Sequence, residues 1–375
     1  MKTPVLQKPN SSSLFVGRKG VLDKLRMIFS SPAGSKFTSR CSCLLWGTGG
    51  IGKTQICLKF IEEMSDRFSH VFWVDASSVE SVTMSLRGIV SSISAAQASC
   101  LDDSVESVLR WMAGIQEEWL IVFDNADVLP VHMVEKFIPS GNRGNILITS
   151  RSRSIGRLVS SENIIEIDEM EEADAVTLLL KAGCLAASAR HVKVAKKIVT
   201  ELGCLPLAVD HAGAYIEAGR CSIDKYLQQF SLHRQTLMSD ATFGGASNYD
   251  QTVYGTWDLS FKEIKRRASE QSSAGDAQAA HAAILILQIC AFYHHSNISK
   301  DIFRSAAEEH GVDSKVVENM PQAMSSPLDR TLLALDNNGH WDEFMFGQGI
   351  AVLLSFSLMK RDKSRSEERR VGKEC

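Results

Sequence analysis

The sequence predicts an α/β fold in which helices cover both faces of a parallel sheet, followed by regions built from helices alone. Several short runs are apolar throughout, and segments with helical spacing of their apolar residues separate them. Such strands are typical of parallel sheets that are buried on both faces. From Glu171 onward the chain shows only helical spacing. The expected strands are Cys43–Trp46, Val71–Val74, Trp119–Phe123 and Asn145–Thr149, with Ile164–Ile167 as a candidate fifth.

The intervening segments predict helices because apolar residues recur on one side of each. Around the sheet we expect helices at Val21–Phe29, Lys53–Met64, Val79–Ser94, Ser104–Ile115 and Met133–Ile138. After it we expect Ala173–Lys181, Val192–Leu202, Leu205–Ala218 and Ile223–Phe230, then Thr252–Ile264, Ala282–Tyr293, Ile298–Glu308 and Phe344–Met359. The segment Lys265–Ala280 is rich in Ser, Ala and Gln, and we expect a polar loop there.

Composition and charge indicate a globular chain without affinity for polyanions. Hydrophobic residues make up 44% of the sequence and charged residues 23%, as in ordinary folded proteins. The formal net charge of -3 gives no electrostatic case for nucleic acid or an anionic membrane as partner. The N-terminus lacks the apolar core of a signal peptide, and no apolar run is long enough to span a membrane. We therefore expect a cytoplasmic protein.

A glycine-rich stretch follows the first expected strand and fits the phosphate-loop pattern GxxxxGK[ST] at every position. Glycine lets backbone N–H groups approach a phosphate closely, and the helix that follows adds the positive end of its dipole. Lys53 would contact the outer phosphates, and the Thr54 hydroxyl would ligate Mg²⁺. The sequence therefore predicts a nucleotide site. Its expected phosphate-binding residues are Gly47, Gly49, Gly50, Ile51, Gly52, Lys53, Thr54 and Gln55.

Asp124, which directly follows an expected strand, is the second candidate Mg²⁺ ligand. A carboxylate on a rigid strand end can hold the water shell of the ion opposite Thr54. The next residue is Asn125, whose amide cannot accept a proton and is a poor general base. Asp127 could reach an attacking water, although its spacing is irregular. These residues predict slow nucleotide hydrolysis at most.

Arg151, at the end of the fourth expected strand, is placed to contact a terminal phosphate through its planar guanidinium. With Lys53 and Asp124 it completes the set of candidate catalytic residues. The stretch Phe15–Arg18 is a weaker signal by itself. It could form a backbone lip for an adenine, with Val16 packed on the ring, or be only a strand-to-helix turn.

Six motifs in this order resemble the NB-ARC ATPases of the STAND class, P-loop NTPases that act as switch modules in the NOD-like receptors of plants, animals and fungi. They are FVGR (15–18), GTGGIGKT (47–54), VFWVDA (71–76), WLIVFDNAD (119–127), NILITSR (145–151) and GCLPLAV (203–209). Two later stretches, TVYGTWDLSF (252–261) and WDEFMFGQGIAVLLSFSLMKRD (341–362), look most like fungal members.

The resemblance implies a five-stranded parallel sheet in which Asn145–Thr149 lies between the phosphate-loop strand and the strand that ends at Asp124. A helical ARC subdomain and an incomplete winged-helix subdomain would follow. The implied ligand is ADP or ATP with Mg²⁺, with Arg151 at the γ-phosphate and Pro206 on the base and ribose side. The resemblance also implies self-assembly into a homo-oligomer in the active state, and effector and sensor domains outside this stretch.

The chain departs from the family pattern at several points. Val21 stands where the first motif often carries an acid, Asn125 replaces a frequent second acid, and the Met-His-Asp motif that closes the winged helix onto ADP is not found. Residues 365–375 read like a translated sequencing adapter, so we expect the native sequence to continue beyond about Ser364. The expected organisation is a disordered segment (1–13), a nucleotide-binding domain (14–168), an ARC subdomain (169–235), a winged-helix-like subdomain (236–364) and the adapter scar (365–375).

The sequence thus favours an ADP/ATP switch that controls an open or closed state in intracellular signalling or defence. One alternative is an active P-loop ATPase or a STAND transcription regulator acting on DNA. The winged helix permits it, but the acidic balance and the lack of a basic recognition helix argue against it. The other alternative is an inactive, truncated fragment.

Overall fold

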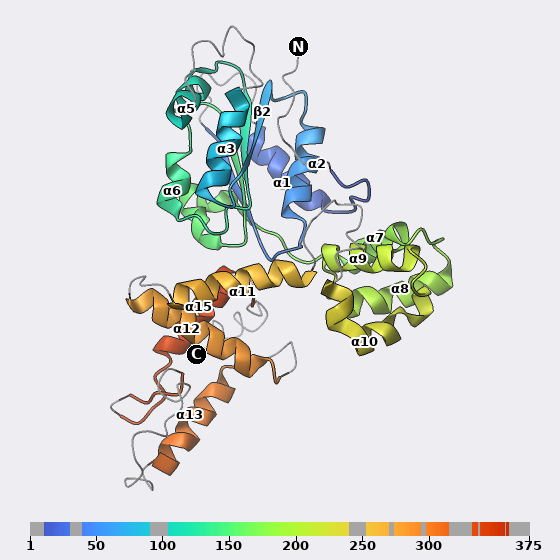
Figure 1. Ribbon diagram of the computed structural model, residues 1–375, viewed down its shortest axis with the longest axis vertical. Coiled ribbons are helices and arrows are strands. Elements are labelled where there is room, and N and C mark those ends of the chain that lie inside the picture. The colour runs from blue at the N-terminus through green and yellow to red at the C-terminus, as the bar shows by residue number, and fades with distance from the viewer. Residues whose placement is uncertain are drawn as a thin grey trace, which may run out of the picture. The chain divides into compact units, whose positions relative to one another are not determined.

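The computed structural model describes residues 11–30, 40–90, 104–239, 253–269, 274–293, 298–314, 332–336, 338–356 and 358–359 (Figure 1). The chain divides into two compact units, Met1–Trp257 and Asp258–Cys375. The first contains a sheet and a group of helices that follows it, and the second is mainly helical. The expected scar at 365–375 and most of the segment 1–13 lie outside the described residues.

Five parallel strands form one sheet in the order β2-β3-β4-β1-β5. This confirms the five-stranded sheet and places β4 between β1 and β3, as the resemblance implied. The carboxyl ends of parallel strands share one edge, where ligands of such sheets bind. The strands are β1 (Ser42–Trp46), β2 (His70–Asp75), β3 (Trp119–Asp124), β4 (Asn145–Ser150) and β5 (Ile164–Glu166).

Successive side chains of each strand point to opposite faces of the sheet, and a separate group of helices covers each face. Cys43 and Leu45 of β1 belong to the core cluster that includes α1 and α2. Leu44, between them, belongs to the cluster that includes α3, α5 and α6. Figure 1 shows the two helix groups on opposite sides of the strands. The helices are α1 (Lys19–Phe29), α2 (Lys53–Glu63), α3 (Val79–Val90), α5 (Val105–Gly114) and α6 (Val131–Lys136).

Four helices follow the sheet within the first unit, and we call them the helical module. α9 begins at Pro206, where a residue without an N–H fits the first helical turn. Gly213 of α9 lies so close to Ala182 of α7 that a Cβ on the glycine would overlap it. All four helices were expected from the sequence. They are α7 (Glu172–Ala182), α8 (Ala189–Glu201), α9 (Pro206–Glu217) and α10 (Ile223–Ser239).

The second unit packs its own core around α12 and α15. Gly349 of α15 lies against the backbone of Ala282 and Ala283, which brings the two helices into close contact. An antiparallel β-bridge joins Leu335 to Trp341. No helix among the residues described above is both long and apolar enough to cross a membrane. Its helices are the larger part of α11 (Val253–Ser269), which begins in the first unit, and α12 (Ala274–Cys290), α13 (Asp301–Ser314) and α15 (Phe344–Ser355).

The polar loop predicted for Lys265–Ala280 is wrong over most of its length. α11 continues to Ser269 and α12 already begins at Ala274, while residues 270–273 lie outside the described part. Alanine has the highest helix propensity of all residues, and Ser269 and Gln278, the Ser and Gln of this stretch within the described helices, are tolerated there. Ala280 is fully buried in the core of the second unit, so tertiary packing supports the helix as well.

Candidate functional site

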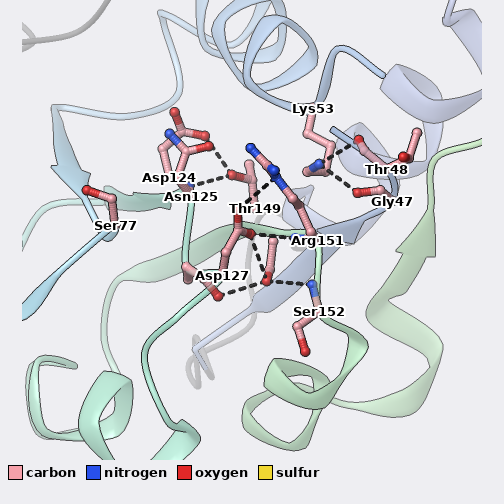
Figure 2. A network of polar contacts seen from close by, with 12 residues as sticks. Gly47, Thr48, Lys53, Ser77, Asp124, Asn125, Asp127, Thr149, Arg151 and Ser152 are labelled. Carbon is pink, nitrogen blue, oxygen red and sulfur yellow. Dashed lines mark hydrogen bonds and ion pairs between the residues drawn. The ribbon is translucent and has the colours of Figure 1, made fainter. Parts of the chain in front are cut away.

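The phosphate-loop motif connects the end of β1 to the start of α2. Gly50 and Gly52 have φ angles of 78° and 94°, a region that strains any residue with a side chain. Lys53 begins α2, and its ammonium donates hydrogen bonds to the backbone carbonyls of Gly47 (2.7 Å) and Thr48 (3.0 Å) (Figure 2). The motif therefore forms a tight loop at a helix N-terminus, the geometry that binds phosphate.

Asp124 lies buried at the carboxyl end of β3, where two hydroxyl groups converge on it. Thr54 Oγ1 donates to Asp124 Oδ1 at 2.9 Å, and Thr149 Oγ1 donates to the same oxygen at 2.6 Å. Burial raises the pKa of the Asp124 carboxyl to about 6, although both hydrogen bonds act in the opposite direction. A carboxylate beside a hydroxyl offers the hard oxygen ligands that Mg²⁺ prefers. The structure thus brings the two predicted metal ligands into contact.

The Lys53 ammonium is buried among charged groups. Burial lowers its pKa to about 8, because a low-dielectric surrounding disfavours the charged form. Asp127 and Asp124 raise the pKa, whereas Arg151 lowers it. Lys53 therefore remains protonated at neutral pH and can contact an anion.

A network of hydrogen bonds joins the chain after β3 to the chain after β4 (Figure 2). Asp127 Oδ1 accepts the Arg151 backbone N–H at 2.6 Å, and Asp127 Oδ2 forms an ion pair with Arg151 Nε at 3.0 Å. Ser150 Oγ donates to the Ala126 carbonyl at 2.8 Å and accepts the Ser152 N–H at 2.9 Å. These contacts fix the direction in which the Arg151 side chain leaves the sheet.

One pocket brings together most of the residues predicted from the sequence. It is lined by the phosphate loop, the end of β4, the start of α9 and the segment before α1. Gly47 and Asp124 do not line it, and Asp124 connects to the pocket through its hydrogen bond with Thr54. The predicted residues that line it are Val16, Gly49, Gly50, Ile51, Gly52, Lys53, Thr54, Gln55, Arg151 and Pro206.

Two residues to which the sequence assigned no contact, Arg18 and Leu207, hold the pocket walls together by hydrogen bonds to backbone carbonyls. The Arg18 guanidinium donates to the carbonyls of Asp168 (2.6 Å) and Ile51 (3.0 Å), so it ties the segment before α1 to the phosphate loop. The Leu207 N–H donates to the Gly50 carbonyl at 3.2 Å, which docks the start of α9 on the same loop. The FVGR and GCLPLAV motifs contained both residues, but sequence spacing does not show what a guanidinium or an N–H contacts.

Three more residues of the site, Thr149, Asp210 and Ser12, were not predicted from the sequence. Thr149 accepts the Asn125 N–H at 2.9 Å in addition to binding Asp124, so it fixes the turn after β3. Asp210, one turn into α9, places a buried carboxylate in the pocket lining. The Ser12 N–H donates to Gln55 Oε1 at 2.8 Å, so the Gln55 side chain holds the segment before α1. A hydroxyl residue at a strand end was the only sequence signal for Thr149.

The residues present fit a nucleotide phosphate group and a divalent cation. Lys53 satisfies its ammonium with two carbonyls of its own loop, so it reaches the place where a phosphate would sit in the loop. A Cβ at Gly50 would lie 3.0 Å from the Leu207 side chain, and the φ of 78° strains any residue with a side chain, so the loop favours glycine there. Thr54 and Asp124 supply neighbouring oxygens for the cation.

Comparisons with known proteins agree with this geometry. Residues 38–188 match the family model described as the NB-ARC domain. A nucleotide-binding leucine-rich repeat (NLR)-like protein of Hyaloscypha variabilis is 26% identical over 284 residues, which cover 68% of this chain and 28% of that protein. The disease resistance RPP13-like protein 4 of Arabidopsis thaliana is 26% identical over 45% of this chain and 21% of its own length.

A solved structure of the ORC2 protein of Aeropyrum pernix shares the fold. Its TM-score is 0.52 at 13% identity, and the match covers 95% of this chain and 90% of that one. The chain spans between 21% and 28% of the length of the curated relatives it matches. The matched family model, the phosphate loop on a five-stranded parallel sheet and the NLR-like and RPP13-like relatives together identify the part of the chain around residues 38–188 as an NB-ARC domain.

Proposed function

We propose that this chain is a molecular switch in which ADP with Mg²⁺ stabilises a closed state and ATP favours an open, self-associating one. The observation that carries the proposal is the contact of α9 with the phosphate loop, where the Leu207 N–H donates to the Gly50 carbonyl at 3.2 Å. Pro206 lines the same pocket. A nucleotide there would touch the sheet and the helical module together, and it can shift their equilibrium by its different affinity for two arrangements.

In this proposal each part of the pocket holds a different part of the nucleotide. The loop Gly47–Gln55 surrounds the phosphates, with Lys53 at the outer ones and Thr54 with Asp124 at Mg²⁺. Val16 and Pro206 face the base and ribose. Arg151 contacts the γ-phosphate, which only ATP carries, so this side chain is where the site distinguishes the two nucleotides.

A switch of this kind needs slow hydrolysis, and the residues after β3 support that. Asn125 occupies the position beside Asp124 and has no group that accepts a proton. Its backbone is held at a φ of 62° by the hydrogen bond from its N–H to Thr149 Oγ1. Both carboxylate oxygens of Asp127 bind the Arg151 turn. We therefore propose that any turnover is slow and that bound ATP persists.

The names of the relatives support a proposal for the biological setting. One is named NLR-like and another a disease resistance protein. These names support a role in intracellular signalling or defence, exercised in the cytoplasm. Because the chain spans only 21% to 28% of its relatives' length, they have room for effector and sensor domains beyond the stretch matched here.

The test is direct binding of nucleotide by the purified chain, measured by calorimetry with Mg²⁺-ADP and with a non-hydrolysable ATP analogue. We expect dissociation constants of about micromolar or tighter for both. Lys53→Ala should abolish binding. Lys59→Ala, on the same helix but more than a third exposed and paired with Glu62, is the matched control and should bind normally. Failure of the natural chain to bind either nucleotide, or unchanged binding by Lys53→Ala, would refute the proposal.

A further inference from the structure

We propose that Asp127 is a positioning residue that holds the Arg151 guanidinium in the orientation required to contact a γ-phosphate. The inference rests on the proposed function, because it assigns Asp127 to the discrimination between ATP and ADP at the same site. It gives Asp127 a role different from the water contact that its place after Asp124 suggested.

Asp127 binds Arg151 at two points that lie at opposite ends of the same residue. One carboxylate oxygen accepts the backbone N–H at 2.6 Å, and the other pairs with Nε at 3.0 Å. An arginine held only by its backbone would keep its long side chain free to rotate. An arginine held at both N–H and Nε has its side-chain torsions constrained as well. The loss of side-chain conformational entropy therefore occurs before a ligand binds.

Burial makes this ion pair persistent. The Arg151 side chain is 9% exposed and the Asp127 side chain 16% exposed, so water and salt screen the attraction weakly. Charge-assisted hydrogen bonds of this kind are about twice as strong as neutral ones. Most of the ion pairs in the described residues lie between side chains that are far more exposed. Persistence is what a positioning contact requires.

The Asp127 carboxylate is itself held in place by Ser150, the last residue of β4. Ser150 Oγ donates to the Ala126 carbonyl at 2.8 Å and approaches Asp127 Oδ1 at 3.3 Å. This hydroxyl therefore ties the Asp127 turn to the last residue of β4, directly before Arg151. Figure 2 shows the Asp127 carboxylate and the Arg151 side chain at the centre of this network.

The charges of the pair also suit the site. Arg151 stands close enough to Lys53 to oppose its protonation, while Asp127 favours it. Without Asp127, Lys53 would lose the carboxylate that most favours its protonation, while Arg151 would still oppose it. Asp127 thus permits Arg151 to lie near the phosphate loop in the free protein, ready for the additional negative charge of ATP.

Asp127→Asn tests the proposal because it keeps the size of the side chain and an oxygen for the Arg151 N–H but removes the charge that holds Nε. We expect affinity for a non-hydrolysable ATP analogue to fall about tenfold, the size of one charge-assisted hydrogen bond. ADP affinity should change far less, because ADP has no γ-phosphate. The readout is the ratio of the two dissociation constants, measured by calorimetry. A general loss of structure would lower both affinities together and would leave this ratio unchanged.

A double-mutant cycle with Arg151→Gln separates positioning from other effects. If Asp127 acts through Arg151, Asp127→Asn should leave the ratio unchanged in the Arg151→Gln background. Asp75→Asn, at the exposed end of the neighbouring strand β2, is the matched control and should leave the ratio unchanged in the natural chain. Asp127→Glu retains the charge but displaces it, so its ratio of dissociation constants should lie between those of Asp127→Asn and the natural chain. This variant provides the comparison if Asp127→Asn does not fold.

The outcomes distinguish this inference from the proposed function. Lack of nucleotide binding by the natural chain overturns both. If the natural chain binds both nucleotides and Arg151→Gln alters the ratio, an unchanged ratio in Asp127→Asn overturns the positioning role alone. The same holds if the Asp127→Asn effect persists fully in the Arg151→Gln background.

Discussion

Asp124 illustrates how burial and hydrogen bonding oppose each other at one residue. Its carboxyl is fully enclosed, which favours the protonated form, yet Thr54 and Thr149 both donate to Oδ1, which favours the ionised form. Burial prevails, and the pKa rises to about 6. The carboxyl therefore lies close to a protonation change just below neutral pH.

We expect Mg²⁺-dependent nucleotide binding to weaken as the pH falls through 6, because Asp124 must be ionised to serve as a ligand. The loss should approach about tenfold per pH unit below that value if one proton is taken up. Above about pH 8, Lys53 of the free protein loses its proton, so affinity should fall there too. Calorimetry between pH 5 and 9 checks the loss of affinity at both the acidic and the alkaline limb of this pH profile.

Asp124→Asn is the control for the acidic limb. It cannot ionise, so the Mg²⁺-dependent part of binding should be small and should no longer change between pH 5 and 7. The alkaline limb, which belongs to Lys53, should survive in this variant. An acidic limb of the same size in Asp124→Asn would contradict the assignment.

Thr149 gives a second prediction at this scale. Its hydroxyl accepts the Asn125 N–H at 2.9 Å and donates to Asp124 Oδ1 at 2.6 Å, and it is fully buried. Thr149→Val keeps the shape but leaves the buried Asp124 carboxyl and the half-buried Asn125 N–H without this partner, so it should lower the free energy of unfolding by about 1–3 kcal/mol. Thr149→Ser retains the hydroxyl and should lose clearly less in urea titrations; an equal loss would show that the methyl group, not the hydroxyl, matters.

At the scale of elements, the contact between α7 and α9 depends on a glycine inside a helix. A Cβ on Gly213 would overlap Ala182 and lie 3.0–3.1 Å from the backbone at the end of α7. Helix propensity alone favours alanine at such a position. The glycine is therefore explained by the close approach of the two helices.

Gly213→Ala should destabilise the first unit by about 1–3 kcal/mol, because the added methyl group has no room. Gly20→Ala in α1 makes the same chemical change where nothing lies within 4 Å of the new atom. It should stabilise by up to about 1 kcal/mol through helix propensity. Denaturant unfolding of both variants compares them, and a stabilising Gly213→Ala would show that α7 and α9 are not in tight contact.

At the scale of the whole molecule, the proposed switch predicts different arrangements with the two nucleotides. The chain consists of two compact units, so a change between them would alter its overall dimensions. We expect small-angle scattering to give a smaller radius of gyration with Mg²⁺-ADP than with a non-hydrolysable ATP analogue. Arg151→Gln, which removes the proposed γ-phosphate contact, should reduce the difference. Identical curves for the natural chain with both nucleotides would exclude a nucleotide-driven rearrangement.

Whether a feature was predicted correctly from the sequence depended on how far apart along the chain the interacting residues lie. The sheet, its flanking helices and the phosphate loop follow from local patterns, and all of them were predicted. The end of α11 and the start of α12 were predicted as a loop, because the composition of Lys265–Ala280 was given more weight than helix propensity and packing. The sequence suggested only that Asp127 could reach an attacking water, because the residue it contacts, Arg151, lies 24 residues further along the chain.

The sequence by itself determined that this protein has a phosphate loop, a carboxylate at the end of the third strand and a parallel sheet, because each is encoded in a short contiguous pattern with its own physical cause. The resemblance to known families supplied the strand order. Only the tertiary structure decided which side chains contact one another across the strand ends. It joined Thr149 to Asp124, Asp127 to Arg151 and Leu207 to Gly50, because these contacts join segments that are distant in the chain.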